Sequence, residues 1–435
     1  MGHQSKVTVE PRLRFPEFVE TGGWSTTELR ELATLVAERV GSTHCVPFTV
    51  VSGVGLVSQV DKLGRTIAGN SLKNYIVLER DDFAYNKSAT KAFPEGYIAR
   101  YVGNQRAAVP NSIFTCFRAD NKKIVPTYLD YLFASNLHGK WLRNFITVGA
   151  RAHGSLNVKD ADLMALPVPL PKGPASLQEQ SKIADCLTSL DEVIVAQGRK
   201  VESLRTYKRG LVQQLFPRVG ETCPRLRFPE FRHAPPWATR QLGPMTSKVG
   251  SGLTPLGGDK NYRVEGRLFM RSQNVGWGEL LLNDVAYIDE ETHRWFDGTE
   301  IREDDVLLNI TGASIGRSAV ADSRVVGGNV NQHVCIIRAK VAELNPVLLN
   351  QFLISERGQR QIDDFQAGGN RQGLNFAQIR SFEIPLPPTG QEQLRIADCL
   401  SSFDVAVVAE SKKLDALKTC KMGLMQQLFP VQEEA

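Results

Sequence analysis

The segment QEQSKIADCL, at Gln178–Leu187, returns as QEQLRIADCL at Gln391–Leu400, 213 positions further along the chain. The same offset relates PRLRFPEF at Pro11–Phe18 to an identical copy at Pro224–Phe231. The string QQLFP also closes both halves at this offset. Three matches at one offset indicate an internal repeat, in which one scaffold is written twice.

The residues between the matched ends differ between the two halves. Positions 25–155 and 238–370 share only scattered residues. We interpret this pattern as one scaffold that carries two different heads. The alternative is an old duplication whose middle parts have drifted, and the near identity of the ends within the same chain argues against it.

Each half ends in a segment with the pattern of a long amphipathic helix. Apolar residues recur at alternating steps of four and three from Ile183 to Leu215, and again from Ile396 to Leu428. This period of 3.5 residues is typical of a coiled-coil seam. Polar residues interrupt the two seams at matching positions, namely Gln197 and Lys208 in the first and Glu410 and Lys421 in the second.

The two helices are expected at residues 176–217 and 389–430. Ser176 lies three residues before Glu179, and Thr389 three before Glu392, which predicts a capping box at the start of each helix. Proline-rich stretches precede both starts, and the LFP sequence stops both ends, because proline does not continue a helix.

A helix over residues 176–216 would be roughly 60 Å long at 1.5 Å per residue. Each apolar seam needs a partner, and the other helix is the nearest candidate. An antiparallel coiled coil would give the chain a pseudo-twofold arrangement, with one head at each end of a rod. The alternative is that each helix packs against its own head, but such a helix is longer than a domain of about 150 residues.

The heads have mixed helix and strand patterns. Residues 75–88 read as a strand that runs into a polar loop, and residues 304–320 as a strand, a glycine-rich turn and a second strand. Apolar helical segments follow at similar places in both halves. The fold class is therefore expected to be α+β, with heads at 11–170 and 224–385 that alternate with the two long helices.

This plan, with a set of short motifs, resembles the specificity subunit of type I restriction–modification systems. That family alternates two target recognition domains with two related helical regions, and the resemblance covers nearly the whole chain. The motifs are weak singly but strong in this order, and besides the two QEQ–IADCL helices they are FAYNKS (Phe83–Ser88), RAHGSLNV (Arg151–Val158), ITGASIGR (Ile310–Arg317) and GNRQGLNFAQIRSFEIPLPP (Gly369–Pro388).

The resemblance implies a non-catalytic chain that binds double-stranded DNA. Each recognition domain of the family grips one half of a split, asymmetric site, while the helices fix the gap and hold two methyltransferase subunits. No cofactor is implied for this chain. S-adenosylmethionine belongs with the methyltransferase partner, and ATP and magnesium belong with a restriction and translocation subunit.

Candidate DNA contacts are polar residues on loops, because bases and phosphates are bound by such side chains and by backbone amides. Gly312 and Gly316 would also let the backbone approach a phosphate. For each candidate the alternative is an ordinary solvated loop residue. The candidates in the first head are Asn86, Lys87, Ser88, Lys91, Arg151 and His153; in the second head they are Arg271, Gln273, Asn274, Thr311, Ser314, Arg317, Asn331, Gln332, Asn370 and Arg371.

Composition sets wider limits on function. The formal charge of +5 permits nucleic-acid binding without demanding it. The seven cysteines form no CxxC pair, which argues against a zinc site or disulfide frame and favours a reducing cytoplasm. The sequence has no apolar run of membrane-spanning length and no secretory signal pattern.

Two other classes of function are alternatives to a DNA-binding specificity subunit. A methylating or cutting enzyme should carry the Asn/Asp-Pro-Pro-aromatic tetrapeptide, a phosphate-binding loop or a metal-binding carboxylate set, and none is evident. A rod-like adaptor with protein-binding heads is the other class. It predicts that no DNA is retained even when the methyltransferase partner is present.

Overall fold

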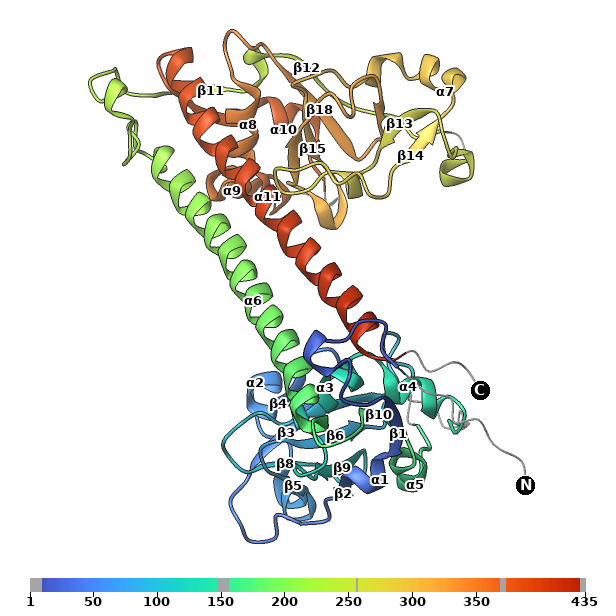
Figure 1. Cartoon of the computed structure of the whole chain (residues 1–435). Helices are drawn as coiled ribbons and strands as arrows, with labels where there is room; N and C mark the ends of the chain where they lie inside the picture. The colour runs from blue at the N-terminus through green and yellow to red at the C-terminus, as the bar shows by residue number, and fades with distance from the viewer. Residues whose placement is uncertain (1–9, 147–155, 256, 368–372, 431–435) are drawn as a thin grey trace. The chain divides into compact units, whose positions relative to one another are not determined.

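The computed structural model describes residues 10–146, 156–255, 257–367 and 373–430 (Figure 1). Contacts divide the chain into two compact units, one of Met1–Ala196 with Lys413–Ala435, the other of Gln197–Lys412. The two long helices are α6 (Ser176–Leu215) and α11 (Gly390–Leu428). Each unit therefore consists of one head together with part of both long helices.

The head of the first unit, head 1, contains two four-stranded sheets. The first has the order β2 (Ala33–Leu35), β9 (Phe114–Ala119), β6 (Asp82–Asn86) and β7 (Tyr97–Arg100). The second has the order β4 (Gly55–Ser58), β3 (Val46–Val51), β8 (Ala107–Val109) and β5 (Ile76–Leu78). A separate antiparallel pair joins β1 (Trp24–Glu28) to β10 (Pro167–Pro171).

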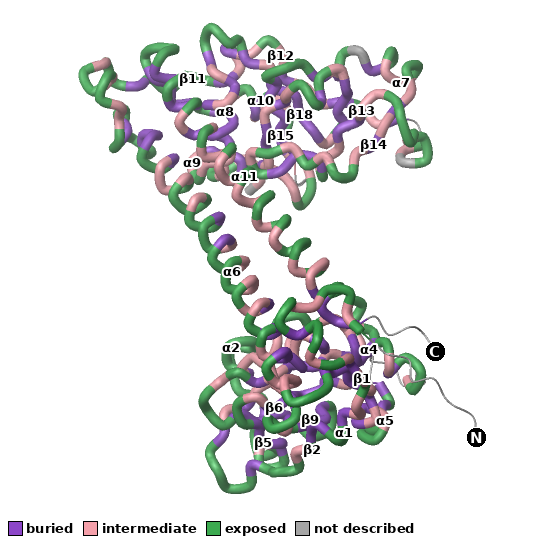
Figure 2. The backbone as a smooth tube through the Cα atoms, in the orientation of Figure 1, coloured by how far each residue is buried: buried purple, intermediate pink, exposed green. Residues whose placement is uncertain are grey.

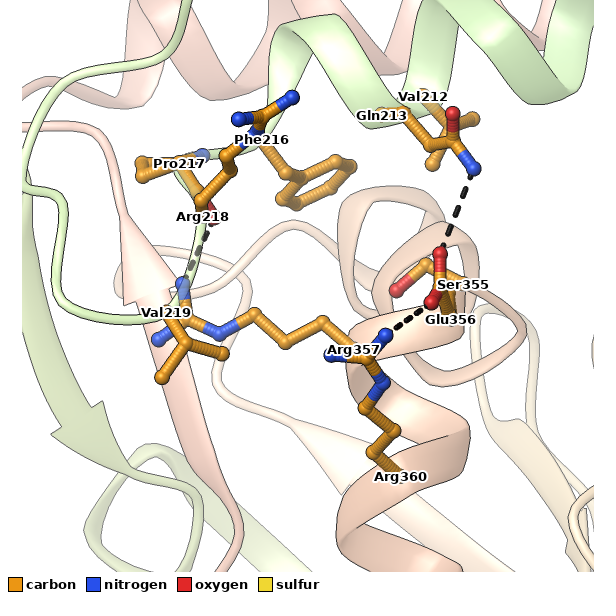
Figure 3. A pocket seen from close by; sticks show the side chains of 10 residues that line it. All are labelled: Val212, Gln213, Phe216, Pro217, Arg218, Val219, Ser355, Glu356, Arg357 and Arg360. Carbon is orange, nitrogen blue, oxygen red and sulfur yellow. Dashed lines mark hydrogen bonds and ion pairs between the residues drawn. The ribbon is translucent and has the colours of Figure 1, made fainter.

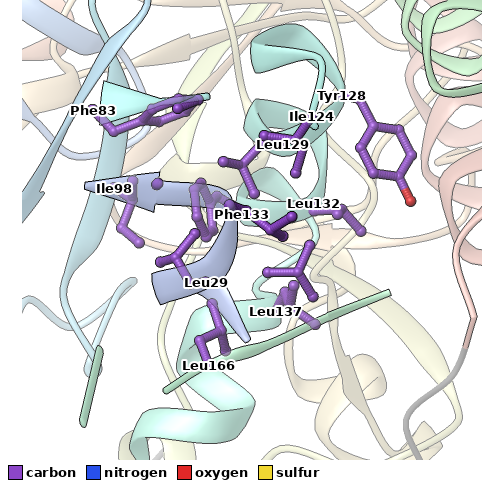
Figure 4. Close-up of a cluster of buried hydrophobic side chains, with 14 of the residues drawn as sticks. Leu29, Phe83, Ile98, Ile124, Tyr128, Leu129, Leu132, Phe133, Leu137 and Leu166 are labelled. Carbon is purple, nitrogen blue, oxygen red and sulfur yellow. The ribbon is translucent and has the colours of Figure 1, made fainter. Parts of the chain in front are cut away.

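The core of head 1 forms where helices cover the first sheet (Figure 4). Phe83 and Ile98 come from β6 and β7, and they pack with Leu129 and Phe133 of helix α3. Proline at the first position of α3 favours the start of that helix there. The short helices of this head are α1 (Leu29–Leu32), α2 (Gln59–Leu63), α3 (Pro126–Ala134), α4 (Leu137–Leu142) and α5 (Asp160–Met164).

The head of the second unit, head 2, has a sheet of order β12 (Thr246–Ser251), β18 (Val334–Ala339), β15 (Val306–Asn309) and β16 (Ser318–Val320). A three-stranded sheet has the order β14 (Ala286–Ile288), β13 (Arg267–Met270) and β17 (Asn329–Val330). The antiparallel pair here is β11 (Ala238–Gln241) with β19 (Glu383–Leu386). The helices are α7 (Glu290–Trp295), α8 (Pro346–Leu353), α9 (Glu356–Ala367) and α10 (Phe376–Arg380).

The two heads share one sheet plan despite their different sequences. The order β2-β9-β6-β7 of head 1 corresponds, strand by strand, to β12-β18-β15-β16 of head 2. In both sheets the second and third strands pair antiparallel, and a helix that begins with proline follows the second strand. The two heads therefore have a common sheet scaffold, and the side chains on it differ.

A buried aspartate marks the same turn in both heads. Asp82 and Asp305 are fully buried, and each accepts two hydrogen bonds from an arginine, Arg118 or Arg338, on the neighbouring strand at 2.7 and 2.8 Å. The residue before each aspartate has a positive φ, 72° and 66°. Each buried aspartate, paired with its arginine, therefore fixes the turn that leads into β6 or β15.

Contacts within each unit place segments of α6 and α11 side by side. In the first unit, Lys421 Nζ lies 2.6 and 2.7 Å from the two carboxylate oxygens of Asp191. In the second, Lys208 Nζ lies 2.6 Å from Asp404, and Gln197 bonds to Glu410. Positions rise along α6 as they fall along α11 in the second unit, so these segments are antiparallel. A coiled coil over the full length of both helices stays a prediction.

The prediction that Glu179 and Glu392 cap the starts of the two long helices is wrong. Glu179 is buried and accepts hydrogen bonds from Arg14, and Glu392 is buried and accepts them from Arg227, so neither carboxylate is free to cap its helix start. Only the other half of one box forms, where Thr389 Oγ1 accepts from the backbone nitrogen of Glu392 at 3.3 Å.

Both long helices end two residues before the proline boundary expected from the sequence, at Leu215 and Leu428. The phenylalanine after each end is buried, Phe216 in the core of head 2 and Phe429 in the core of head 1. Figure 2 shows buried residues gathered in the heads, while the middle parts of α6 and α11 are mainly half-buried or exposed. None of the helices in the described part of the chain is long and apolar enough to cross a membrane.

Candidate nucleic-acid interface

Two parallel strands of head 2 end side by side, and candidate residues follow both ends. Strands β13 and β17 are parallel, with Met270 opposite Val330. Arg271–Asn274 follows β13, and Asn331 and Gln332 follow β17. The backbone nitrogen of Asn331 donates to the oxygen of Met270 at 2.9 Å, which ties the two loops together.

The glycine-rich turn after β15 joins the same edge. Asn309 Nδ2 donates to the backbone oxygen of Ser272 at 2.8 Å, and Oγ1 of Thr311 lies 2.6 Å from Nδ1 of His333. The turn from Thr311 to Arg317 therefore lies beside the loops that follow β13 and β17. We name this surface the head 2 edge, defined by Arg271, Gln273, Thr311, Ser314, Arg317, Gln332 and His333.

Two donors of the head 2 edge are held by one carboxylate. Arg271 Nη2 lies 3.3 Å from Oδ1 of Asp284, and Gln273 Nε2 donates to Oδ2 of the same side chain at 2.6 Å. The guanidinium carbon of Arg271 also lies 5.6 Å from the centre of the Tyr262 ring. Because the Asp284 side chain is 79% exposed, a phosphate or base edge could take its place as the acceptor.

Two of the predicted contacts are buried and already bonded within head 2. The Asn274 amide donates to the backbone oxygens of Leu281 and Asp284 at 2.9 and 2.7 Å, and it accepts from the nitrogen of Arg271 at 3.0 Å. Asn331 is 7% exposed and accepts from the nitrogen of His333. Both side chains shape the loops, so their prediction as DNA contacts gains no support from their geometry.

In head 1 the candidates follow β6. Asn86 ends this strand and is buried, with its side-chain oxygen accepting from the nitrogen of Ser88 at 3.1 Å. Lys87 Nζ bonds to Asp160 at 3.0 Å and is half-buried, while Lys91 is exposed. The head 1 edge is defined by Lys87, Ser88, Lys91, Ser112 and Ile113, because the backbone nitrogen of Lys87 donates to the oxygen of Ile113 at 3.0 Å.

Four predicted contacts lie outside the described residues: Arg151, His153, Asn370 and Arg371. Their described chain neighbours do reach the two edges. The nitrogen of Leu156 donates to the oxygen of Lys87 at 2.8 Å, and that of Leu374 donates to Ile310 at 2.9 Å. These four residues stay predictions.

Sequence reasoning missed three residues that the structure brings to the edges. Ser112 and Ile113 precede β9, and His333 precedes β18. The hairpin of β3 and β4 was also missed, and its turn residue Val54 is 73% exposed. Strand register alone reveals Ile113 and Val54, which are apolar, whereas His333 directly follows the candidates Asn331 and Gln332 and could have been found from that polar stretch.

Among the residues that the structure describes, no group of three or more His, Cys, Asp or Glu side chains could hold a metal ion. A hollow of about 410 Å³ lies in the second unit where α6 ends (Figure 3). Arg357 reaches across it and donates to the backbone oxygen of Pro217 at 2.9 Å, and burial lowers the pKa of Arg357. Cations at a helix C-terminus stabilise it, so we assign this arginine a structural role.

A larger hollow, of about 680 Å³, lies in the second unit between both long helices and head 2. Val407 and Val408 of α11 line it with Ile354 and with Trp277, whose side chain is 53% exposed. The charged residues around the hollow include two ion pairs, Lys208 with Asp404 and Arg209 with Glu202. The hollow thus combines an apolar floor with a charged rim.

Comparisons of this chain with a family model and with curated proteins point to the same family. Residues 279–419 match the family model described as the type I restriction modification DNA specificity domain. Two curated relatives from Methanocaldococcus jannaschii are named as type I restriction enzyme specificity subunits. The MjaX protein is 23% identical over 77% of this chain and 74% of its own length, and the MjaVIII protein is 21% identical over 69% of both chains.

Solved structures agree in fold. The crystal structure of a type I restriction-modification S subunit from M. genitalium matches with a TM-score of 0.58 at 14% identity, over 98% of this chain and 100% of that one. A chain from a study of assembly and conformational transition in a type I R-M system matches with a TM-score of 0.54 at 17% identity, over 94% and 98%.

These comparisons confirm the resemblance to the specificity subunits of type I restriction–modification systems, together with the mixed helix and sheet fold. The relatives are named as specificity subunits, in agreement with the expectation of a chain that recognises DNA without a reaction of its own.

Proposed function

We propose that this chain is the DNA specificity subunit of a type I complex, and that its two heads read two different halves of a split site. The observation that carries the proposal is the pairing of one common sheet plan with two unlike edges. Head 1 presents Lys87, Ser88 and Ile113 where head 2 presents a different set. A common scaffold docks in a common way, and unlike side chains at the docked edge select unlike bases.

The chemistry of the head 2 edge suits DNA. Arginine and glutamine side chains bind base edges in the major groove, and Arg271 and Gln273 lie together on one loop. Gly312 and Gly316 have φ values of 72° and 85°, which residues with a side chain rarely adopt. The turn between them exposes backbone that can approach a phosphate closely.

We propose that α6 and α11 set the spacing and hold two methyltransferase subunits. Exposed apolar residues on these helices support a protein partner, since Val195 and Val408 occupy equivalent positions of the repeat and are 51% and 43% exposed. The larger hollow beside Trp277 gives such a partner an apolar floor. Replacing Val408 with aspartate should reduce co-purification of the methyltransferase, with the exposed Val341 changed in the same way as the control.

The reaction chemistry is placed in the partner subunits. The methyltransferase would bind S-adenosylmethionine, and a restriction and translocation subunit would bind ATP and magnesium. The recognition domains are proposed at residues 11–170 and 224–385, with α6 (Ser176–Leu215) and α11 (Gly390–Leu428) as the spacer helices. The described cysteines are all free, which agrees with a proposed location in the cytoplasm.

A head exchange tests the proposal. Residues 25–155 would be replaced by the corresponding head of a relative, and the complex with its methyltransferase would be expressed in cells. Sequencing of the methylated DNA should show one half of the motif changed and the other half, with the gap, unchanged. A change in both halves would contradict the modular reading by two heads.

Two binding measurements separate the rival classes. An adaptor with protein-binding heads predicts no retention of DNA by the complex, whatever head it carries. A chain that methylates alone would bind labelled S-adenosylmethionine without its partner, and such binding would overturn the non-catalytic role.

A further inference from the structure

We propose that Ile113 and His333 are equivalent base-reading positions, one in each head. In head 1 this position makes an apolar contact, and in head 2 it makes hydrogen bonds. This inference rests on the proposed function, because it names residues through which the two heads would select different bases.

The backbone establishes that the two positions are equivalent. Lys87 donates from its nitrogen to the oxygen of Ile113 at 3.0 Å, and Ile310 donates in the same way to His333 at 3.0 Å. Lys87 lies five residues after the buried Asp82, as Ile310 lies five after Asp305.

The neighbouring strands, β9 in head 1 and β18 in head 2, align Ile113 with His333 independently. Ile113 lies five residues before Arg118, and His333 lies five before Arg338. These two arginines are the partners of the buried aspartates. Ion pairs and backbone bonds therefore bring Ile113 and His333 to one point of the shared sheet plan.

The surroundings of the two side chains differ in chemistry. Ile113 is 39% exposed, and Ser112 beside it is also exposed. His333 is half-buried, with Oγ1 of Thr311 2.6 Å from Nδ1 and Nε2 of Gln332 3.3 Å from its own Nε2. Thr311 and Gln332 thus hold the imidazole ring in one orientation at the head 2 edge.

These chemistries match different features of the major groove. An exposed isoleucine can contact only an apolar feature, and the C5-methyl group of thymine is the one that a base pair presents there. Because both ring nitrogens of His333 are engaged by Thr311 and Gln332, it is the hydroxyl of Thr311 and the amide of Gln332, oriented by the ring, that offer hydrogen bonds to a base edge, such as N7 of a purine. We therefore assign Ile113 to a thymine in one half-site and the cluster of Thr311, Gln332 and His333 to a hydrogen-bonding base in the other.

Exchange of the two side chains tests the assignment. The variants I113H and H333I would each be expressed with the methyltransferase partner, and the methylated motifs would be sequenced. Each variant should lower methylation of the original motif by about tenfold through one base position of one half-site. I113H should weaken the requirement for thymine at one position of the first half-site. H333I should weaken the base requirement at one position of the second half-site.

The control variants carry the same changes away from the edges. V341H alters an exposed valine beyond the far end of β18, and H233I alters an exposed histidine before β11. Both should leave the motif unchanged. If I113H fails to fold, I113A keeps the backbone bond to Lys87 and should relax the same thymine position.

The outcomes distinguish this inference from the proposed function. A wild-type complex that yields no two-part motif would overturn the proposed function, and this inference with it. A wild-type complex with a two-part motif that neither folded variant alters would overturn this inference alone. A change in both half-sites from one substitution would also overturn it, because each residue belongs to one head.

Discussion

Gln197 and Glu410 hold the same position in the two copies of the repeat, 213 residues apart, and they bond to each other. Nε2 of Gln197 donates to Oε2 of Glu410 at 2.6 Å and to its backbone oxygen at 2.9 Å. The next polar interruptions also correspond, because Lys208 and Lys421 are each paired with an aspartate of the other helix within their own unit. The polar breaks in the two seams are therefore matched to one another.

Loss of the amide should weaken the second unit. Q197L is expected to lower the free energy of unfolding by about 1 kcal/mol, because Glu410 loses a hydrogen bond in a partly buried place while Lys200 still pairs with it. The double variant Q197L/E410L should recover the wild-type value or exceed it, because a well-packed apolar pair often replaces a buried polar pair without loss. Urea unfolding followed by circular dichroism measures both.

A control for this pair is the exposed contact of Arg209 with Glu202, whose side chains are 72% and 63% exposed. R209A should stay within about 0.5 kcal/mol of the wild type. A double variant less stable than Q197L would show that the two residues do not face each other at an apolar seam.

The long helices could be predicted from sequence because their pattern is local. A period of 3.5 residues repeats over the whole of each helix, and the prolines at the ends restrict both boundaries. The capping boxes failed for a physical reason: a distant residue, Arg14 in one copy and Arg227 in the other, holds the glutamate. Sequence spacing cannot reveal a partner 165 positions away.

The common sheet plan of the two heads could not be predicted from the sequence repeat, because equivalent residues of the heads are not separated by one constant number of positions. Asp82 and Asp305 are 223 positions apart, whereas Ile113 and His333 are 220 apart. The matched ends are 213 apart, so loops of different length shift the alignment within the heads. Equivalence is visible only through hydrogen-bond register, which is why the heads looked unrelated in sequence.

The candidate interface could be predicted only in part, because residue type is visible in the sequence but the meeting of loops is not. Arg271 and Thr311 lie on polar loops, and residue type alone singled them out. That these two loops meet at one edge depends on strand order, which short motifs do not encode. Residue type also misled, since Asn274 and Asn331 are polar loop residues whose side chains are used inside the fold.

A buried ion pair locks the repeated RFPEF segment to each long helix. Nε and Nη2 of Arg14 donate to the two oxygens of Glu179 at 2.7 and 2.8 Å, and the Trp24 indole donates to the same carboxylate at 3.3 Å. R14A should lower the free energy of unfolding by about 3–5 kcal/mol, because it leaves a buried carboxylate without its partner. Thermal unfolding of the whole chain measures the effect.

Two further variants separate lost charge from lost packing at this site. R14K keeps the charge but cannot bond to both oxygens, so it should recover only part of the loss. R14M/E179M removes the charges together and should be more stable than R14A. If R14A unfolds at the wild-type temperature, the ion pair contributes nothing to the stability of the first unit.

The stability of the first unit should fall in mild acid because of His138. Burial lowers the pKa of this side chain from 6.5 to about 4, and its ring packs against Tyr85 and Phe133. Below pH 6.5 the unfolded chain binds a proton that the folded chain rejects, so stability present above that pH is lost as pH falls toward 4. The loss should reach up to about 3 kcal/mol, measured as urea midpoints at pH 7 and pH 4.5.

Removal of the titrating group should flatten this dependence. H138Q is expected to be less stable than the wild type at pH 7 but to lose less stability between pH 7 and pH 4.5. H44Q changes an exposed histidine and should keep the wild-type slope. Equal slopes for H138Q and the wild type would exclude His138 as the source of the acid sensitivity.

Equal lengthening of the two long helices tests the proposal that they set the gap between half-sites. Insertion of seven residues into each helix preserves the apolar seam and adds about 10 Å at 1.5 Å per residue. With about 3.4 Å per base pair along DNA, the gap in the methylated motif should widen by about three base pairs. Both half-sites should keep their bases, because neither head is changed. An unaltered gap in a folded, active complex would mean that something other than these helices sets the spacing.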